Sequence, residues 1–343
     1  MSLLQRVPSD RFHYSVVSQN AIPGCQNFPK GIEVRVTGKL SGPFLGRISQ
    51  YFLLREIEES PPELIDVQHR RMLPTGVWLS RRLGVPYVVT VHDYLRDRET
   101  FAVDPTFCRR VIAVSESVRA ELLDRTKLSE SLVDVIPTGV AVPPDESLCQ
   151  VLSGERPPVI GTCGPLEPDR GLTDFLQAAA ATKTHFPETL YLIAGSGPEE
   201  KNLRKLARSL GLADSITFLP NLTEFAPALL AMDIFVLPSL KQGLGSTMLD
   251  AMARGIPVIG TESGGVFSVV SHGKTGILVP PQDQTAITDA ICGLLADRPH
   301  AQKLGEAARI RVSEKFHVDS MVEATCKLYG SILQAEHPTI ATS

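Results

Sequence analysis

The sequence predicts an α/β protein with two domains, each built around a parallel sheet. Short apolar segments rich in valine, isoleucine and phenylalanine alternate with longer segments of helical periodicity along most of the 343 residues. This alternation is typical of parallel strands joined by helical crossovers. It is interrupted at residues 141–158, which contain four prolines and no hydrophobic periodicity. Such a composition is typical of a linker between two domains.

Composition and charge exclude several classes of protein. Apolar residues make up 43% of the chain, charged residues 21%, and the net charge is −4, which gives no reason to expect nucleic acid as a partner. There is no run of eighteen apolar residues and no apolar signal sequence at the N-terminus, so we expect a cytoplasmic protein. The cysteines lack metal-ligand spacing, so we expect buried reduced thiols at Cys25, Cys108, Cys149, Cys163, Cys292 and Cys326.

In the first half of the chain, two histidines follow expected strands. The strands are expected at residues 12–17, 64–67, 87–91, 111–114 and 133–136, and helices at residues 47–59, 74–83 and 116–125. His69 and His92 come just after two of these strands. Because ligands bind at the carboxyl ends of parallel strands, both are candidates for a ligand-binding edge, with a core histidine as the alternative. Arg70 and Arg71 are expected to be solvated, or else to bind an anionic lipid or a sugar acid.

The second half repeats the alternation. We expect strands at residues 159–162, 190–194, 216–219 and 234–237, and a helix at residues 172–181. The linker composition places the boundary between an N-terminal domain of residues 1–150 and a C-terminal domain that begins at residue 151.

The densest set of reactive residues lies between Asp233 and Gly265. An apolar strand is followed by the glycine loop Gln242-Gly243-Leu244-Gly245 and then by a helix that we expect Ser246 or Thr247 to cap. The N-terminus of such a helix has free N–H groups and the positive end of the helix dipole. The sequence therefore predicts a phosphate site here, with Asp250 one turn further along the helix.

These motifs together resemble the retaining glycosyltransferases of family 4. In that family two glutamates, eight positions apart, bracket a glycine loop, and Gln242 and Asp250 stand at those positions here. Residues 164–171, GPLEPDRG, are similar to the family's Gly-Arg-Leu-x-x-x-Lys-Gly segment, with Arg170 at the lysine and Pro165 at the arginine. Further matches are PTGV at residues 137–140, GSGP at residues 195–198 and HGKTGILV at residues 272–279.

The resemblance implies the GT-B fold, in which two Rossmann-like domains face a cleft. It implies retaining transfer from a UDP- or GDP-sugar to a saccharide or lipid-linked acceptor, in the synthesis of cell-surface polysaccharide or glycolipid. No metal and no other cofactor is implied, and the enzyme would be cytoplasmic or peripherally associated with the inner face of a membrane. The C-terminal domain would end at residue 317, and a last helix at residues 318–333 would return to the first domain before a tail to residue 343.

The same resemblance implies the roles of individual residues. His92, Arg170 and Gln242 would act at the reaction centre, and His69 and His92 would line the acceptor side. The donor would be bound by Gly164, Arg170, Gly195, Leu219, Gln242, Gly243, Leu244, Gly245, Ser246 and Asp250. The ordinary alternatives are a surface arginine for Arg170 and an exposed helical acid for Asp250.

Two other classes of function are alternatives to a glycosyltransferase. Gln242 carries no charge, Pro165 replaces a cation, and the family's first strand and glycine loop do not precede residue 12. These three features favour, as an alternative, a non-catalytic relative that binds a nucleotide and acts as a partner or regulator. A nicotinamide-dependent dehydrogenase would need Gly-x-Gly-x-x-Gly after a first strand, and neither expected domain begins that way.

Overall fold

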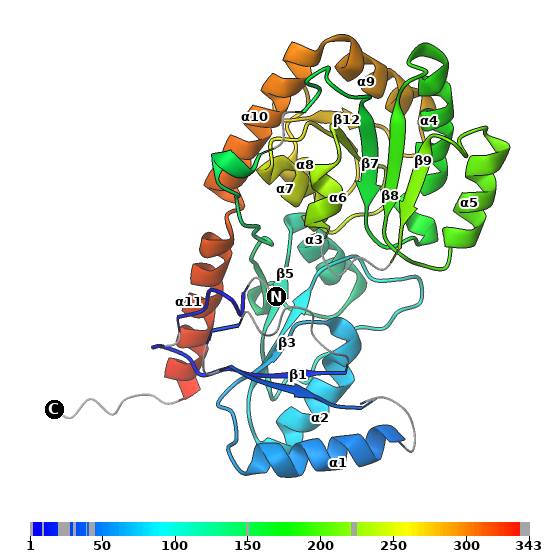
Figure 1. Cartoon of the computed structure of the whole chain (residues 1–343). Helices are drawn as coiled ribbons and strands as arrows, with labels where there is room; N and C mark the ends of the chain where they lie inside the picture. The colour runs from blue at the N-terminus through cyan, green and yellow to red at the C-terminus, as the bar shows by residue number, and fades with distance from the viewer. Residues whose placement is uncertain are drawn as a thin grey trace. The chain divides into compact units, whose positions relative to one another are not determined.

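The chain divides into two compact units. The computed structural model describes residues 3–8, 10–19, 28–29, 32–38, 40, 45–148, 151–220 and 225–336. Unit 1 comprises Met1–Pro137 and Val318–Ser343, and unit 2 comprises Thr138–His317 (Figure 1). Unit 2 thus begins before the boundary expected after residue 150. Cys25, Cys149 and the expected tail beyond residue 336 lie outside the described residues.

Unit 2 is built on a six-stranded parallel sheet. Its strands are β7 (Val159–Cys163), β8 (Leu190–Ala194), β9 (Ile216–Leu219), β10 (Ile234–Leu237), β11 (Val258–Thr261) and β12 (Ile277–Val279). Their spatial order is β12-β11-β10-β7-β8-β9, and every neighbouring pair is parallel. This is the Rossmann order, which reverses between β7 and β10. The carboxyl ends of these two strands therefore mark the expected ligand crevice of unit 2.

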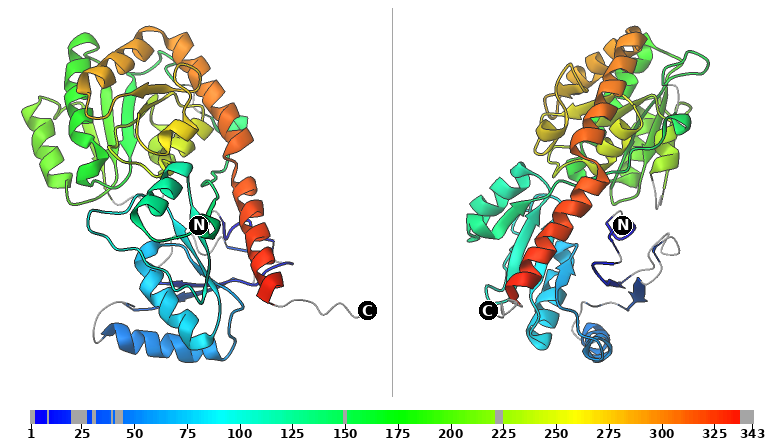
Figure 2. Two further views of the ribbon diagram at one scale, coloured as in Figure 1. Left: turned by 180° about the vertical axis from the view of Figure 1, so that it is seen from behind. Right: turned by 90° about the vertical axis from the view of Figure 1, so that its left-hand side faces the viewer.

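Helices surround this sheet, and apolar side chains join them to it (Figure 2). Phe175 and Tyr191 are almost fully buried in one core cluster together with residues of β7 and β10. The helix α4 packs against α5 and α9, whereas α7 packs against α10. The helices of unit 2 are α4 (Leu172–His185), α5 (Glu200–Ser209), α6 (Ala226–Leu230), α7 (Ser246–Ala253), α8 (Val266–Val269), α9 (Gln284–Ala296) and α10 (Arg298–Lys315).

Unit 1 contains a four-stranded parallel sheet in sequence order and a separate parallel pair. The sheet consists of β3 (Ile65–Val67), β4 (Tyr87–Val91), β5 (Cys108–Ala113) and β6 (Val133–Val135), and the pair of β1 (Ser15–Ser18) and β2 (Glu33–Val36). All five residues of β4, YVVTV, are buried, as its β-branched and aromatic sequence predicts. The strand β2, EVRV, alternates charged and apolar residues and was not predicted. The helices include α1 (Leu45–Glu58), α2 (Leu73–Leu83) and α3 (Glu116–Arg125).

The last helix, α11 (Val318–Glu336), belongs to unit 1 (Figure 2). Tyr329 is 3% exposed and packs in one cluster with Val88 of β4. Its hydroxyl donates a hydrogen bond to Asp66 Oδ2 over 2.5 Å. Burial raises the pKa of Asp66, and the hydrogen bond from Tyr329 acts in the opposite direction. Apolar contact and this polar pair together attach the helix to β3 and β4.

One buried carboxylate fastens the beginning of unit 2 to its sheet. Asp233, which directly precedes β10, is 2% exposed. It accepts hydrogen bonds from the backbone amides of Leu152 (2.7 Å) and Val159 (2.8 Å). Arg156 Nη1 donates a third bond over 2.7 Å. These contacts give residues 152–159 a fixed place in unit 2, although the composition of this part of the chain resembles that of a linker.

Replacing Asp233 by asparagine should therefore destabilise the protein. Hydrogen bonds to a charged group contribute about 1.5–3 kcal/mol each, and the substitution weakens several at once, so we expect a loss of about 2–4 kcal/mol. Urea denaturation of Asp233→Asn measures this loss. The exposed Asp214→Asn is the matched control and should change the unfolding free energy by less than about 0.5 kcal/mol. Equal stability of the two variants would contradict the anchoring role.

Candidate functional site

The loop after β7 lies against the loop after β10 at the point where the strand order reverses. Gly171 has a φ of +62° and follows the short helix η5 (Pro168–Arg170). A Cβ atom on Gly171 would lie 1.9 Å from the carbonyl oxygen of Pro238, so the two backbones meet without room for a side chain. The backbone amide of Leu240 also donates to the carbonyl of Asp169 over 2.9 Å. The two loops are therefore held together by their backbones.

This contact brings two of the predicted site residues together. Arg170 Nη1 donates a hydrogen bond to Gln242 Oε1 over 2.7 Å. The Arg170 side chain is 14% exposed, and its Nε lies 3.7 Å from Asp169 Oδ1. Arg170 is therefore not a surface arginine that extends into solvent, which was the alternative to a phosphate-binding role.

The glycine loop is fixed from the other side by the segment after β11. A Cβ atom on Gly265 would lie 1.9 Å from the carbonyl oxygen of Gly243. The amide of Gly265 donates to the carbonyl of Gln242 over 2.9 Å. Leu244 is 3% exposed, so the ligand contact predicted for this residue can come only from its backbone. The loop is thus a rigid backbone turn with its one apolar side chain in the core.

Two buried hydroxyl groups support the start of the same loop. Thr261 Oγ1 and Ser263 Oγ both donate to the carbonyl of Ser239, over 2.5 Å and 2.9 Å. No motif in the sequence predicts a role for Thr261 or Ser263, or the close backbone contacts of Gly171 and Gly265. Gly171 ends the segment that resembles a family motif, and Gly265 ends the segment that begins at Asp233, but nothing local in the sequence identifies their backbone partners.

The N-terminus of α7 opens directly onto this loop. Gly245, with a φ of +89°, is the N-cap, and no side chain accepts a hydrogen bond from the first turn. The prediction that Ser246 or Thr247 caps the helix is therefore wrong. Ser246 is the first helical residue, and Thr247 Oγ1 donates to the carbonyl of Cys163 over 3.2 Å. The helix consequently presents its first amides and the positive end of its dipole without a side-chain cap.

Asp250 lies one turn along α7, on the side of β7. Burial raises the pKa of its carboxyl group, while the charge of Arg254 acts in the opposite direction. Arg254 Nη1 lies 3.4 Å from Asp250 Oδ1 and donates to the Asp250 carbonyl over 2.7 Å. The pKa of Cys163, the last residue of β7, is raised to about 12, mainly by burial and to a smaller extent by the negative charge of Asp250. Thr247 contacts the carbonyl of Cys163, and Asp250 is three residues further along the same side of the helix, so Asp250 lies close to the carboxyl end of β7.

Three further predicted residues follow the carboxyl edge of the sheet. The amide of Gly164 donates to the carbonyl of Ala194, and the amide of Gly195 donates to the carbonyl of Leu219, both over 2.9 Å. A Cβ atom on Gly195 would lie 1.9 Å from the Gly164 carbonyl oxygen. Gly164, Gly195 and Leu219 thus form a continuous backbone edge across β7, β8 and β9.

In unit 1, the two predicted histidines follow neighbouring strands. His69 comes after β3, and its Nδ1 accepts a hydrogen bond from the amide of Arg71 over 3.1 Å. His92 comes after β4, and its Nε2 lies 3.0 Å from the carbonyl oxygen of Gln68. Desolvation lowers the pKa of both rings, and the hydrogen bond to Gln68 opposes this for His92. Among the described residues, no group of three or more His, Cys, Asp or Glu side chains is arranged to hold a metal ion.

The fold and the site of unit 2 define a class of protein. A Rossmann sheet, a helix without a side-chain cap, a glycine loop and a nearby arginine meet at the strand-order reversal, which is where Rossmann proteins bind nucleotides. Residues 146–311 match the family model of the glycosyl transferases group 1, and residues 3–142 match that of glycosyltransferase family 4. The chain belongs to this family of glycosyltransferases.

Named relatives agree with this assignment over part of their length. The chain is 35% identical over 161 residues to N-acetyl-alpha-D-glucosaminyl L-malate synthase of Bacillus anthracis, which covers 47% of this chain and 42% of the relative. It is 34% identical over 177 residues to the GDP-mannose-dependent alpha-(1-6)-phosphatidylinositol monomannoside mannosyltransferase of Mycobacterium tuberculosis, covering 49% and 46%. These alignments span less than half of either relative.

Solved structures share the fold over most of the chain. Anabaena HepE in complex with UDP and glucose has a TM-score of 0.76 at 21% identity and covers 88% of this chain and 87% of its own. WaaG, a glycosyltransferase involved in lipopolysaccharide biosynthesis, has a TM-score of 0.74 at 14% identity and covers 95% and 94%. The predicted fold class, with two Rossmann-like domains, is confirmed.

The contact between Gly265 and Gly243 can be tested by adding one methyl group. Gly265 has a φ of −68°, which alanine adopts easily, so Gly265→Ala acts only through its clash with the loop. We expect the displaced loop to weaken binding of UDP or GDP about tenfold or more in calorimetry, as one lost charged hydrogen bond would. Gly293→Ala in α9 is the control, because its Cβ meets no atom within 4 Å. Equal affinity of both variants would exclude the loop from the binding site.

Proposed function

We propose that this protein transfers a sugar from a nucleotide diphosphate sugar to a saccharide or lipid-linked acceptor, with retention at the anomeric carbon. The observation that carries the proposal is the contact of Arg170 with the glycine loop before α7. This contact places a guanidinium beside a helix N-terminus. Both groups bind phosphate oxygens, so together they suit a diphosphate. Synthesis of cell-surface polysaccharide or glycolipid is the process that we propose for it.

The proposed chemistry depends on stabilising the leaving diphosphate. As the bond between the anomeric carbon and the phosphate oxygen breaks, negative charge grows on the diphosphate. Arg170 and the first amides of α7 face that charge, and each charge-assisted hydrogen bond contributes about 1.5–3 kcal/mol. The acceptor oxygen then bonds to the anomeric carbon on the same face and gives its proton to a diphosphate oxygen.

The other donor contacts follow from the same placement. We propose that Asp250 accepts hydrogen bonds from the ribose hydroxyls and that the edge formed by Gly164, Gly195 and Leu219 lies beside the nucleotide base. Gln242 turns its amide oxygen to Arg170, so its amide nitrogen is the group that would donate to a sugar hydroxyl. Because an amide is neither a base nor a nucleophile, Gln242 would position the sugar.

We propose that His92 and His69 serve the acceptor side of the reaction. A carbonyl oxygen only accepts hydrogen bonds, so the contact with Gln68 assigns the proton of neutral His92 to Nε2. Its Nδ1 then accepts a hydrogen bond from a substrate hydroxyl. The lowered pKa favours this neutral form at pH 7.

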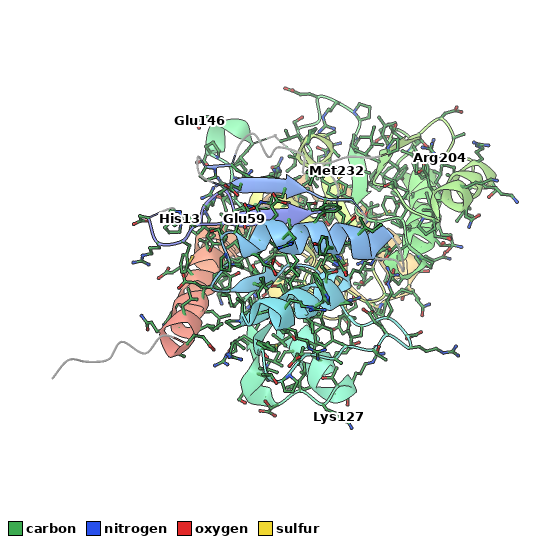
Figure 3. All side chains as sticks on the ribbon, turned by 90° about the horizontal axis from the view of Figure 1, so that it is seen from below. His13, Glu59, Lys127, Glu146, Arg204 and Met232 are labelled. Carbon is green, nitrogen blue, oxygen red and sulfur yellow. The ribbon has the colours of Figure 1, made fainter. Side chains whose placement is uncertain are left out.

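We further propose a cytoplasmic location with peripheral binding to a membrane. No described helix has the length and apolarity to cross a bilayer. However, α1, the blue helix beside the labelled Glu59 in Figure 3, exposes Ile48, Tyr51 and Phe52 by 51%, 54% and 67% on one stripe. Arg55 extends over the ring of Tyr51, with 5.9 Å to its centroid. Aromatic groups beside a cation suit the interface of a bilayer.

Arg170→Ala tests the donor site. Loss of one charge-assisted hydrogen bond should weaken binding of UDP or GDP about tenfold or more. Calorimetry measures the affinity, and hydrolysis or transfer is followed across a panel of UDP- and GDP-sugars. Arg208→Ala, at the end of α5, removes the same charge away from the glycine loop and should bind as the wild type does. Unchanged affinity in Arg170→Ala would remove this residue from the site.

The same panel separates the enzyme from the non-catalytic alternative. Turnover of one donor by the wild type supports the transferase. Nucleotide binding with no hydrolysis or transfer of any donor would favour a partner or regulatory protein that has kept the nucleotide site.

Membrane binding is tested with vesicles. The double variant Tyr51→Ser and Phe52→Ser removes the two most exposed aromatic rings of α1, so we expect it to lose most of the wild type's co-flotation with phosphatidylglycerol-containing liposomes. The control is Ile310→Ser in α10, which is 52% exposed in unit 2 and should float as the wild type does. Flotation of both variants to the same extent would exclude α1 as the lipid contact.

A further inference from the structure

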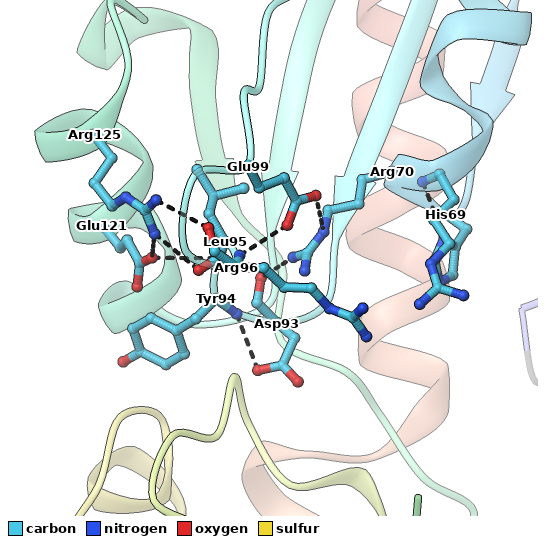
Figure 4. Close-up of polar contacts among 10 residues, drawn as sticks. His69, Arg70, Asp93, Tyr94, Leu95, Arg96, Glu99, Glu121 and Arg125 are labelled. Carbon is cyan, nitrogen blue, oxygen red and sulfur yellow. Dashed lines mark hydrogen bonds and ion pairs between the residues drawn. The ribbon is translucent and has the colours of Figure 1, made fainter. Parts of the chain in front are cut away.

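The loop that follows β4, residues 93–99, is held by charged side chains from both neighbouring segments (Figure 4). We call it the β4 loop. Arg70, from the short helix η2 (Arg70–Met72) after β3, reaches it on one side. Arg125 and Glu121 of α3, which follows β5, reach it on the other. The strands β3 and β5 flank β4 in the sheet, so the loop lies between the two segments that hold it.

Arg70 makes two contacts with the ends of the β4 loop. Its Nη1 donates to the carbonyl oxygen of Asp93 over 2.6 Å, and its Nε lies 2.8 Å from Glu99 Oε1. Glu99 Oε2 in turn accepts a hydrogen bond from the amide of Arg96 over 2.8 Å. The Arg70 side chain is 14% exposed, so the prediction of a solvated arginine is wrong for Arg70. It holds for the exposed Arg71.

The helix α3 fixes the middle of the loop. Arg125 Nη1 donates to the carbonyl of Leu95 over 2.8 Å, and Nη2 donates to the carbonyl of Arg96 over 3.0 Å. Glu121 Oε1 accepts from the amide of Leu95 over 3.1 Å and from Arg125 over 2.9 Å. Arg98, within the same loop, has a φ of +61°, a conformation that costs a non-glycine residue about 1–3 kcal/mol. The surrounding hydrogen bonds offset this strain.

The contacts of Arg70 lead directly to His92. Residues 68–70 touch residues 92–93 twice, because Gln68 binds the His92 ring and Arg70 binds the carbonyl of the next residue, Asp93. The first contact sets which ring nitrogen carries the proton. The second sets the orientation of the peptide group that follows the histidine. A planar guanidinium can bond Asp93 and Glu99 at once, whereas a lysine ammonium is a single point charge.

We propose that Arg70 is a positioning residue, which orients His92 for the reaction by fixing the Asp93 peptide and, through Glu99, the β4 loop. This proposal rests on the role of His92 in the proposed function. Arg70 itself has no assigned contact with a substrate. Arg70 acts on His92 only through the backbone of the β4 loop in unit 1. Replacing Arg70 should therefore leave the donor site of unit 2 intact.

The experiment compares Arg70→Ala and Arg70→Lys with the wild type. The first readout is independent of activity: the ¹⁵N signals of the His92 ring, assigned with His92→Gln. We expect the wild type to show the Nε2-protonated form with a pKa below the ordinary value. In Arg70→Ala the ring should lose this preference, because a displaced His92 no longer meets the carbonyl oxygen of Gln68. Unchanged ring signals in Arg70→Ala would overturn the proposal.

The second readout is sugar-nucleotide turnover with nucleotide affinity. A misplaced reacting group costs up to about 10²-fold in rate, so we expect kcat in Arg70→Ala to fall by one to two orders of magnitude. The affinity for UDP or GDP should stay near that of the wild type, whereas the melting temperature should fall, because Arg70→Ala removes two contacts of a mostly buried charged side chain. Methylguanidine should restore part of kcat in Arg70→Ala, and Arg70→Lys should lie between Arg70→Ala and the wild type.

The matched control is Arg82→Ala, which removes an exposed arginine of α2 in the same unit and should leave both readouts unchanged. Unchanged kcat in Arg70→Ala, or a loss of nucleotide affinity as large as the loss of kcat, would overturn the positioning role. A wild type that binds nucleotide but turns over no donor would instead contradict the proposed function. In that case the ring signals of His92 still decide whether Arg70 orients it.

Discussion

The site of unit 2 depends on close backbone contact at positions that have no room for a Cβ atom. Gly171 meets the carbonyl of Pro238, and Gly265 meets the carbonyl of Gly243, each at 1.9 Å from where a Cβ would be. Side chains at these glycines would separate the loops that follow β7, β10 and β11. Arg170 would then no longer reach the glycine loop. The electrostatics of the site thus depend on this steric constraint, because it sets the distance between the loops that carry the charged groups.

The electrostatics follow from what these contacts bring together. The guanidinium of Arg170 and the first amides of α7 supply positive potential at one end of the site. Asp250, one turn along the helix and near the end of β7, supplies a carboxylate at the other. A ligand with a diphosphate and neutral hydroxyl donors matches this order of charges. The neutral amide of Gln242 accepts a hydrogen bond from Arg170 and leaves the positive charge of Arg170 uncompensated. A carboxylate at this position would neutralise that charge.

Much of the fold could be predicted from the sequence because its strands are short apolar runs between turn residues. The runs at β4, β8 and β10 are buried along almost their whole length and needed no tertiary information. The strand β2 was missed because charged residues interrupt its apolar positions. The cap of α7 was also missed, because a serine after a glycine is a common cap and only the φ of Gly245 shows that the glycine takes this position.

Arg70 and Arg71 differ in their tertiary contacts, which the sequence alone does not predict. Two adjacent arginines after a strand look alike in the sequence, and solvation is the simplest expectation for both. In the folded unit, Arg70 turns to the β4 loop, where a carbonyl and a carboxylate converge from residues over twenty positions away, while Arg71 stays exposed. Burying a guanidinium is costly unless such partners already exist. The loop geometry therefore decides which of the two arginines is held in the folded unit, and Arg70, not Arg71, is the one placed to orient the neighbouring histidine.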